Sequence, residues 1–281
     1  MIVITGATGA LNGATLEHLL KVVPAEEIGL SVRDVVKARS FAERGVRVRR
    51  GSYDDQAALR DSFEGADQVL LVSSNDPNAD GVALHRTAIE AAVAAGARRI
   101  LYTSHQNVRG DSAFAPARDH AATEEILAGT GVAWTSLRNG FYAHSLGWLL
   151  GPWRETGEIT APEDGPVSWT HRADAAEAAA VILAGGQSFE GPVTLTAGAV
   201  TFDDIAAIAV DRTGRQVKRV VVEDERWLTD RIATGTPEPM ARMLLSFFLA
   251  ARRGDFAETG PRLGELLGRE PLTVAEAITA G

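Results

Sequence analysis

Apolar and polar positions alternate along the first half of the chain in two rhythms. Short, nearly continuous runs of aliphatic and β-branched residues recur between longer segments of helical periodicity. The apolar runs are IVIT, IGLSV, VRVRR, QVLLVS, RILYTS and VAWTSL. Such runs are typical of parallel strands that are buried on both faces, and segments such as ALHRTAIEAAVAAG have the length of crossover helices. We therefore predict an α/β fold with a Rossmann-type, doubly wound parallel sheet over residues 1–138.

The rhythm changes beyond Arg138. Residues 139–281 begin with aromatic-rich loops and continue with a helix near 172–184, the strand PVTLTA, a helix after Thr201, the strand VKRVVV and a mostly helical end. We expect these pieces to form mainly a smaller C-terminal α/β cap that binds substrate, with the helix near 172–184 returning to the Rossmann domain. Because open α/β sheets bind ligands at the carboxyl ends of their strands, the cap is expected to close a substrate cleft there.

Composition narrows the classes of function. A length of 281 residues suits one large α/β domain, or a dominant domain with a smaller partner. The formal net charge is -9 and the basic residues are scattered, so the chain lacks the positive surface that binds nucleic acid. There is no cysteine, and the histidines show no metal-ligand spacing. We expect neither a nucleic-acid partner nor a metal.

The apolar segments also indicate where the protein works. The longest of them, MLLSFFLAA, is much shorter than the ~20 residues that a membrane-spanning helix needs. The first apolar run is too short for a signal peptide and follows no positively charged region. We expect a cytoplasmic protein without membrane contact. A homodimer is common for such folds, although the sequence does not demonstrate one.

The first predicted strand runs directly into the glycine-rich turn GATGALNG. A G-x-x-G-x-x-G loop would carry its third glycine at position 12, but that position is Asn12 and the glycine is Gly13. Gly6 permits the tight turn, and Gly9 lets the backbone approach a pyrophosphate at a helix N-terminus. The third glycine serves packing, so its displacement affects spacing more than binding. We predict that the loop still binds a dinucleotide, with the Asn12 amide directed toward solvent or toward the cofactor.

The second predicted strand ends in SVRDVVK, where a dinucleotide fold meets the adenosine ribose. Arg33 and Lys37 are four residues apart, so on one helical face they would clamp a 2′-phosphate from two sides. Asp34 would either serve a ribose hydroxyl or cap the following helix. The two cations favour NADPH, with NADH the less favoured cofactor.

Several motifs occur in a characteristic order and spacing: GATGALNG, SVRD-x-x-K, GSYDD, LLVSS, RILYTS, DHAATEEIL and WTSLRNGFY. Together they resemble the NmrA-like atypical short-chain dehydrogenases, and most closely the bacterial NADPH-dependent quinone reductases and triphenylmethane reductases of that group. The resemblance is strongest from Met1 to about Asp174 and is one of general layout beyond it. It implies an NADPH-dependent oxidoreductase that transfers hydride to a quinone or a similar flat conjugated acceptor.

The resemblance also implies a cofactor site along the ends of the strands. Around the pyrophosphate it places Gly6, Thr8, Gly9, Ala10 and Leu11, with Asn12 beside them. Near the adenine it places Tyr53 and Asp54. After the fourth and fifth strands, toward the riboses and the nicotinamide, it places Ser73, Ser74, Asn75, Thr103, Ser104 and His105. Beneath the ring and the substrate it places Asn139, Gly140, Phe141 and Tyr142.

The usual catalytic pair of short-chain dehydrogenases is absent. In those enzymes a Tyr-x-x-x-Lys motif follows the fifth strand and protonates a carbonyl group. Here the corresponding helix reads PARDHAATEEIL, and the resemblance puts His120 at the lysine position and Pro116 at the tyrosine position. His120 and Tyr142 are the candidate catalytic groups. His120 would bind the nicotinamide ribose or relay a proton, and its alternative role is that of a structural histidine. The alternative role of Tyr142 is plain aromatic packing.

Aromatic residues gather just after the predicted sheet. The candidate substrate contacts are Phe141, Tyr142, Trp148 and Trp169. They would wall an apolar pocket, fix the cap to the sheet, or do both. Few charges lie among them, which favours a flat hydrophobic acceptor over sugar phosphates. The missing Tyr-x-x-x-Lys motif keeps two alternatives open: a non-catalytic NADP(H)-sensing regulatory protein, or a ketoreductase acting on an aromatic natural product.

Overall fold

The computed structural model of the chain describes residues 1–74, 76, 79–185 and 189–279. Within these residues a parallel sheet of seven strands has the order β10-β6-β5-β4-β1-β2-β3. Its strands are β1 (Ile2–Thr5), β2 (Ile28–Val32), β3 (Arg47–Arg50), β4 (Gln68–Leu71), β5 (Arg99–His105), β6 (Ala133–Asn139) and β10 (Gly191–Leu195). The first six have the 3-2-1-4-5-6 order of a doubly wound dinucleotide-binding sheet, so the predicted fold class is confirmed.

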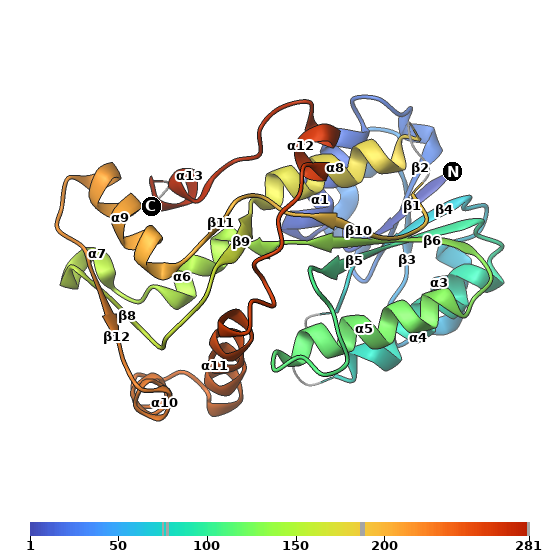
Figure 1. Cartoon of the computed structure of the whole chain (residues 1–281). Helices are drawn as coiled ribbons and strands as arrows, with labels where there is room; N and C mark the ends of the chain where they lie inside the picture. Colours follow the sequence, from blue (N-terminus) through green and yellow to red (C-terminus); the bar gives the residue numbers. More distant parts are fainter. Residues whose placement is uncertain (75, 77–78, 186–188, 280–281) are drawn as a thin grey trace.

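Helices cover both faces of this sheet (Figure 1). On one face lie α1 (Ala10–Leu19), α8 (Arg172–Leu183) and α12 (Arg262–Leu267), and on the other α3 (Gln56–Ser62), α4 (Gly81–Ala94) and α5 (Ala115–Ala128). Neighbouring strand residues point to opposite faces, so Ile4 belongs to the apolar core under α1, whereas Val3 belongs to the core under α4. Both side chains are completely buried, which explains the continuous apolar runs in the sequence.

The strand PVTLTA does not belong to the cap. Its residues form most of β10, which pairs in parallel with β6 at the edge of the main sheet. Pro192 has no N–H to donate, and an edge strand tolerates this because, among the described residues, one side of it has no partner strand. Helix α8 packs on α1. The chain therefore returns from the cap to the sheet before it enters the cap again.

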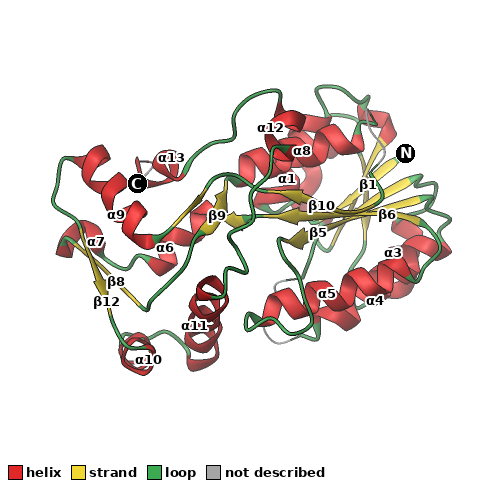
Figure 2. Cartoon of the chain, in the orientation of Figure 1, coloured by secondary structure: helices red, strands yellow, loops and turns green. Residues whose placement is uncertain are grey.

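The cap is a smaller lobe at the carboxyl ends of the strands (Figure 2). Its strands are β7 (Phe141–Tyr142), β8 (Glu158–Ala161), β9 (Val167–Thr170), β11 (Ala199–Val200) and β12 (Lys218–Val221). Its helices are α6 (Leu146–Leu149), α7 (Trp153–Thr156), α9 (Phe202–Thr213), α10 (Asp224–Ala233), α11 (Glu238–Arg252) and α13 (Val274–Thr279). Short helical segments complete the fold: η1 (Ala25–Glu27), η2 (Val35–Ala38), α2 (Arg39–Ala42) and η3 (Ala143–Ser145).

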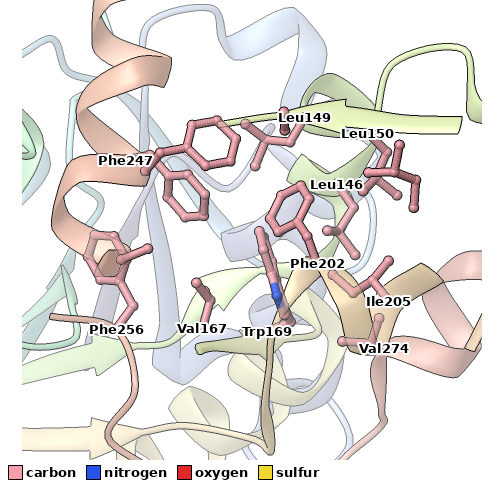
Figure 3. Close-up of a cluster of buried hydrophobic side chains, with 14 of the residues drawn as sticks. Leu146, Leu149, Leu150, Val167, Trp169, Phe202, Ile205, Phe247, Phe256 and Val274 are labelled. Carbon is pink, nitrogen blue, oxygen red and sulfur yellow. The ribbon is translucent and has the colours of Figure 1, made fainter. Parts of the chain in front are cut away.

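An aromatic core holds the cap together (Figure 3). Trp169, Phe202, Phe247 and Phe256 are completely or almost completely buried in it. Helix α11, which contains the stretch MLLSFFLAA, is 15 residues long and contributes Phe247 to this core. Within the described part of the chain, none of the helices combines the length and the apolar character that crossing a membrane requires.

Candidate active site

The turn after β1 is shaped by its first two glycines. Gly6 has a φ of +63°, and a Cβ at this position would lie 2.5 Å from Cγ1 of Val72, just beyond β4. Gly9 is the N-cap of α1, where no side chain caps the helix and the first turn contains no acid. The amide groups of that turn are therefore available to an anion, which the helix dipole also favours. Thr8 and Ala10 are exposed beside Gly9, and Leu11 is half-buried.

The displaced third glycine has a structural explanation. Nδ2 of the buried Asn12 donates a hydrogen bond of 2.8 Å to the carbonyl oxygen of Thr5, at the end of β1. The prediction that this amide faces solvent or cofactor is therefore wrong, because a buried carbonyl takes it as its partner. A Cβ on Gly13 would lie 2.9 Å from the carbonyl oxygen of Ala7. Gly13 thus permits the close packing, while Asn12 ties α1 to β1.

Two arginines meet at the ends of β2 and β3. Arg33 follows β2 directly, and Arg50 ends β3, where it pairs in register with Val32. The two arginines line a surface hollow of about 540 Å³ together with Ser52, Asp54, Asp55, Gln56 and Ala58. A hydrogen bond from Ser52, with smaller contributions from the two arginines, lowers the pKa of the exposed Asp54. The hollow offers two guanidinium groups to an anion.

Lys37 is not among the residues that line this hollow. The segment after Arg33 forms η2, a 3₁₀ helix, so residues four apart do not share a face as they would in an α-helix. Asp34 accepts a hydrogen bond of 3.0 Å from the amide of Val36 and therefore caps η2. Of the two roles that the sequence left open for Asp34, the structure shows the cap.

Tyr53 connects two central strands. Its hydroxyl lies 2.7 Å from Oγ1 of Thr5 and donates a hydrogen bond of 2.8 Å to the carbonyl oxygen of Val72. Burial raises the pKa of Tyr53. The hydroxyl is engaged within the protein, which favours a structural role over contact with adenine.

Polar residues after β4 and at the end of β5 form hydrogen bonds that fix the strand ends. The amide of Ser73 donates to Oγ1 of Thr103 at 2.8 Å, and the amide of Ser74 donates to Nε2 of His85 at 2.7 Å. Oγ of Ser104 donates to the buried Glu124 at 2.8 Å. The contact between Ser73 and Thr103 brings the residues after β4 beside the end of β5. Asn75 lies outside the described residues.

His120 on α5 belongs to a hydrogen-bonded cluster. Its Nδ1 lies 2.7 Å from the hydroxyl of Tyr102 on β5, and the same hydroxyl lies 3.3 Å from Nδ1 of His85 on α4. Burial lowers the pKa of His85 to about 4, and it lowers the pKa of His120 well below its usual range, with neighbouring histidines adding to the effect. Both rings are neutral at pH 7. Sequence reasoning missed Tyr102 and the role of His85; the signal was a tyrosine inside a buried strand, which needs a hydroxyl partner.

His105, at the end of β5, lies among aromatic rings. Its ring centroid is 5.2 Å from that of Phe141 and 5.3 Å from that of Phe256. Nδ1 lies 2.9 Å from the carbonyl oxygen of Gln106, to which it donates. Burial lowers the pKa of His105 to about 4, so Nε2 carries no proton at neutral pH, and it is buried without a partner among the described residues.

The end of β6 leads into the cap through Gly140. A Cβ there would lie 2.2 Å from Oγ1 of Thr170, so only glycine allows β6 and β9 to approach so closely. Nδ2 of Asn139 donates to the hydroxyl of Tyr142 at 3.2 Å. Burial raises the pKa of Tyr142 to about 12, which keeps the phenol protonated at neutral pH.

Three of the predicted aromatic contacts lie in different surroundings. Phe141 is half-buried and lies beside His105, where the sheet meets the cap. Trp169 is completely buried in the cap core, with its ring centroid 5.4 Å from that of Phe141 (Figure 3). Trp148 is 62% exposed on the surface. The complete burial of Trp169 favours a packing role over contact with a substrate, and the exposure of Trp148 favours a surface role.

Comparison with known proteins places this geometry in context. The model of the NmrA-like family matches residues 1–276. Quinone oxidoreductase 2 of Escherichia coli (strain K12) is 35% identical over 282 residues, which cover 99% of this chain and 98% of that protein. A solved structure of E. coli NADPH-dependent quinone oxidoreductase QOR2 with NADPH is 33% identical, with a TM-score of 0.91 and 99% of each chain covered. Citrobacter sp. triphenylmethane reductase with NADP(H) is 30% identical, with a TM-score of 0.90 and the same coverage.

Proposed function

This chain belongs to the NmrA-like family, and from that premise we propose that it transfers hydride from NADPH to a quinone or a similar flat conjugated acceptor. The observation that carries the proposal is the 35% identity to the E. coli quinone oxidoreductase over almost the full length of both chains. The protein is an NADPH-dependent oxidoreductase, and the resemblance predicted from its motifs is confirmed.

The glycine turn fits a dinucleotide. The position of Gly6 cannot hold a side chain, and the uncapped start of α1 offers amide groups to the pyrophosphate. Arg33 and Arg50 would hold the 2′-phosphate in the hollow that they share, each as a planar donor that matches phosphate oxygens. When bound, NADPH supplies the hydride, that is, two electrons and one proton.

The substrate would lie at the junction of sheet and cap. The rings of His105, Phe141 and Phe256 gather there. Aromatic and apolar walls suit a flat conjugated ring and exclude water from the reacting atoms. Orientation and exclusion of water are the main contributions of the protein to such a reaction.

A quinone also suits the missing Tyr-x-x-x-Lys pair. Hydride transfer to a quinone gives a hydroquinone monoanion, whose charge is spread over a conjugated ring and which takes its second proton from water. The buried His85 and His105, whose pKa values lie at about 4, are neutral at pH 7 and hold no acidic proton for a carbonyl group. The structure thus favours an acceptor that needs little acid catalysis.

A substrate panel tests this proposal. The purified protein is first titrated with NADPH by intrinsic fluorescence, and NADPH oxidation is then followed with simple quinones, a triphenylmethane dye and aromatic ketones. We expect tight binding and oxidation with quinones, and little with ketones. Turnover of ketones alone would indicate a ketoreductase, and tight binding without any turnover would indicate a sensor; either result would overturn the proposal.

A further inference from the structure

The groups that surround His85 determine which of its ring nitrogens carries the proton. The amide of Ser74 lies 2.7 Å from Nε2 of His85, and a backbone amide can only donate. Nε2 of His85 therefore carries no proton. Because the ring is neutral at pH 7, its proton lies on Nδ1.

That proton directs the hydroxyl of Tyr102. Nδ1 of His85 donates a hydrogen bond to Oγ1 of Thr123 at 2.9 Å, and the hydroxyl of Thr123 in turn donates a hydrogen bond to the carbonyl oxygen of Asp119 at 2.8 Å. Nδ1 of His85, which carries the proton, also lies 3.3 Å from the hydroxyl of Tyr102. The hydroxyl therefore cannot donate its own proton to His85. Its own proton must point elsewhere. Oγ1 of Thr123 also borders the hydroxyl but already accepts from His85, and we assign the proton to Nδ1 of His120, which lies at the short distance of 2.7 Å.

We propose that Tyr102, backed by His85, is a positioning residue that holds His120 in the neutral tautomer with its proton on Nε2, from which it donates a hydrogen bond to the substrate oxygen that gains charge during hydride transfer. The identity of that oxygen as a quinone oxygen rests on the proposed function. The tautomer does not, because it follows from the contacts of His120, Tyr102 and His85 alone.

Nε2 of His120 is open to an incoming acceptor. It has no hydrogen-bond partner among the described residues, and the side chain is half-buried on the first half of α5. The ring is stacked beside that of His105, at 6.4 Å between centroids, and His105 borders the rings of Phe141 and Phe256. The ring that carries this nitrogen therefore lies beside the region where a flat acceptor would lie.

The chemistry requires no proton from His120. Two electrons and one proton reach the quinone as hydride, the product is a hydroquinone monoanion, and water supplies the second proton. His120 keeps its proton throughout and stabilises the developing negative charge with a fixed N–H dipole. A histidine with its proton on Nδ1 would instead direct a lone pair at that charge and oppose the reaction.

Nitrogen NMR of the full-length protein tests the tautomer. Protonated and bare imidazole nitrogens have widely separated ¹⁵N shifts, and loss of signals in His120→Gln identifies those of His120. We expect the proton on Nε2 in the wild type and a shift toward the other tautomer in Tyr102→Phe. Tyr53→Phe is the matched control: it removes another buried hydroxyl, bound to Thr5 and Val72, and should leave the His120 signals unchanged. A wild-type proton on Nδ1 would overturn the proposal, whether or not the variants fold.

A double-mutant cycle tests the function of the tautomer. The side-chain amide in His120→Gln presents an N–H near the position of Nε2 whatever Tyr102 does. We expect Tyr102→Phe to lower kcat with a quinone about ten-fold in the wild type and by less than about two-fold in the His120→Gln background. Equal losses in both backgrounds would contradict the positioning role. If the wild type reduces no quinone, the proposed function fails, while the NMR experiment still decides the tautomer.

Discussion

At the scale of single residues, we expect the same loop to bind the cofactor through some residues and to pack the helix through others. Gly6 and Gly9 leave room and amide groups for a cofactor, whereas Asn12 and Gly13 pack α1 against the end of β1. The G-x-x-G spacing alone indicated the first pair. The direction of the Asn12 side chain could not be predicted, because it depends on a carbonyl oxygen that becomes buried only when α1 packs on the sheet.

Gly6→Ala is expected to weaken NADPH binding at least ten-fold. The new Cβ would collide with Val72, and its φ of +63° is strained for alanine, so the turn must move away from the pyrophosphate site. Gly65→Ala is the matched control: its φ is +74°, but nothing lies within 4 Å of the added Cβ. Fluorescence titration should show that only the first variant loses affinity. Equal affinities of the two variants would contradict the role given to Gly6.

Arg33→Ala and Arg50→Ala are each expected to weaken NADPH about 10- to 100-fold and NADH much less. Each variant removes a charge-assisted contact to the 2′-phosphate, which is worth about 1.5–3 kcal/mol. Lys37→Ala is the comparison variant and should lose less, because Lys37 lies outside the hollow that the two arginines line. The dissociation constants of each variant for NADPH and for NADH show how selectively the affinity for NADPH is lost. Equal losses of affinity for NADPH and NADH would contradict the proposal that the 2′-phosphate binds in this hollow.

At the scale of elements, the sequence predicted most of the main sheet but assigned its edge strand β10 to the cap. Most of the first six strands were recognisable because burial on both faces leaves nearly continuous apolar runs, and that signal is local; the edge strand β3 is partly exposed. β10 is an edge strand with Pro192 near its start, and its partner β6 lies more than 50 residues earlier in the chain. Its sheet therefore could not be inferred from its own pattern.

The same limit applies to the candidate site. His120 was recognised from its place on the helix after the fifth strand. Tyr102 and His85 were missed as its partners, because their hydrogen bonds join β5, α4 and α5 across 17 and 18 positions of sequence. Periodicity placed both residues in buried elements but could not say which polar atoms meet there.

Glu124 joins three of these elements, and its replacement should destabilise the fold. It is buried on α5 and accepts hydrogen bonds from Ser104 on β5 and from Ser136 and Arg138 on β6. Glu124→Gln leaves Arg138 without its carboxylate, and we expect the free energy of unfolding to fall by about 2–4 kcal/mol. Glu125→Gln, at the exposed neighbouring position, should change it by less than about 0.5 kcal/mol. Urea unfolding compares the two, and equal effects would mean that the buried network contributes no stability.

At the scale of the whole molecule, stability should depend on pH through the buried histidines. The pKa of His85 is about 4 in the folded protein, below the 6.5 of an exposed histidine, so between these values the unfolded chain binds the extra proton. The contribution of His85 to the free energy of unfolding is therefore complete above pH 6.5 and is lost as the pH falls toward 4. This loss amounts to about 3 kcal/mol. The free energy of unfolding, measured at several pH values in this range, should depend less steeply on pH in His85→Gln than in the wild type. An unchanged slope would show that His85 titrates normally.

The whole molecule brings a cofactor turn, an aromatic junction between sheet and cap, and a neutral histidine to one end of a parallel sheet. If these parts serve hydride transfer, the bond that breaks is the C4–H bond of the nicotinamide. The most direct measurement is a single turnover, in which protein loaded with NADPH is mixed with a simple quinone and the nicotinamide absorbance is followed. We predict rapid loss of that absorbance, slowed when the transferred hydrogen is deuterium. Stable absorbance of the bound NADPH in the presence of excess quinone would contradict the account.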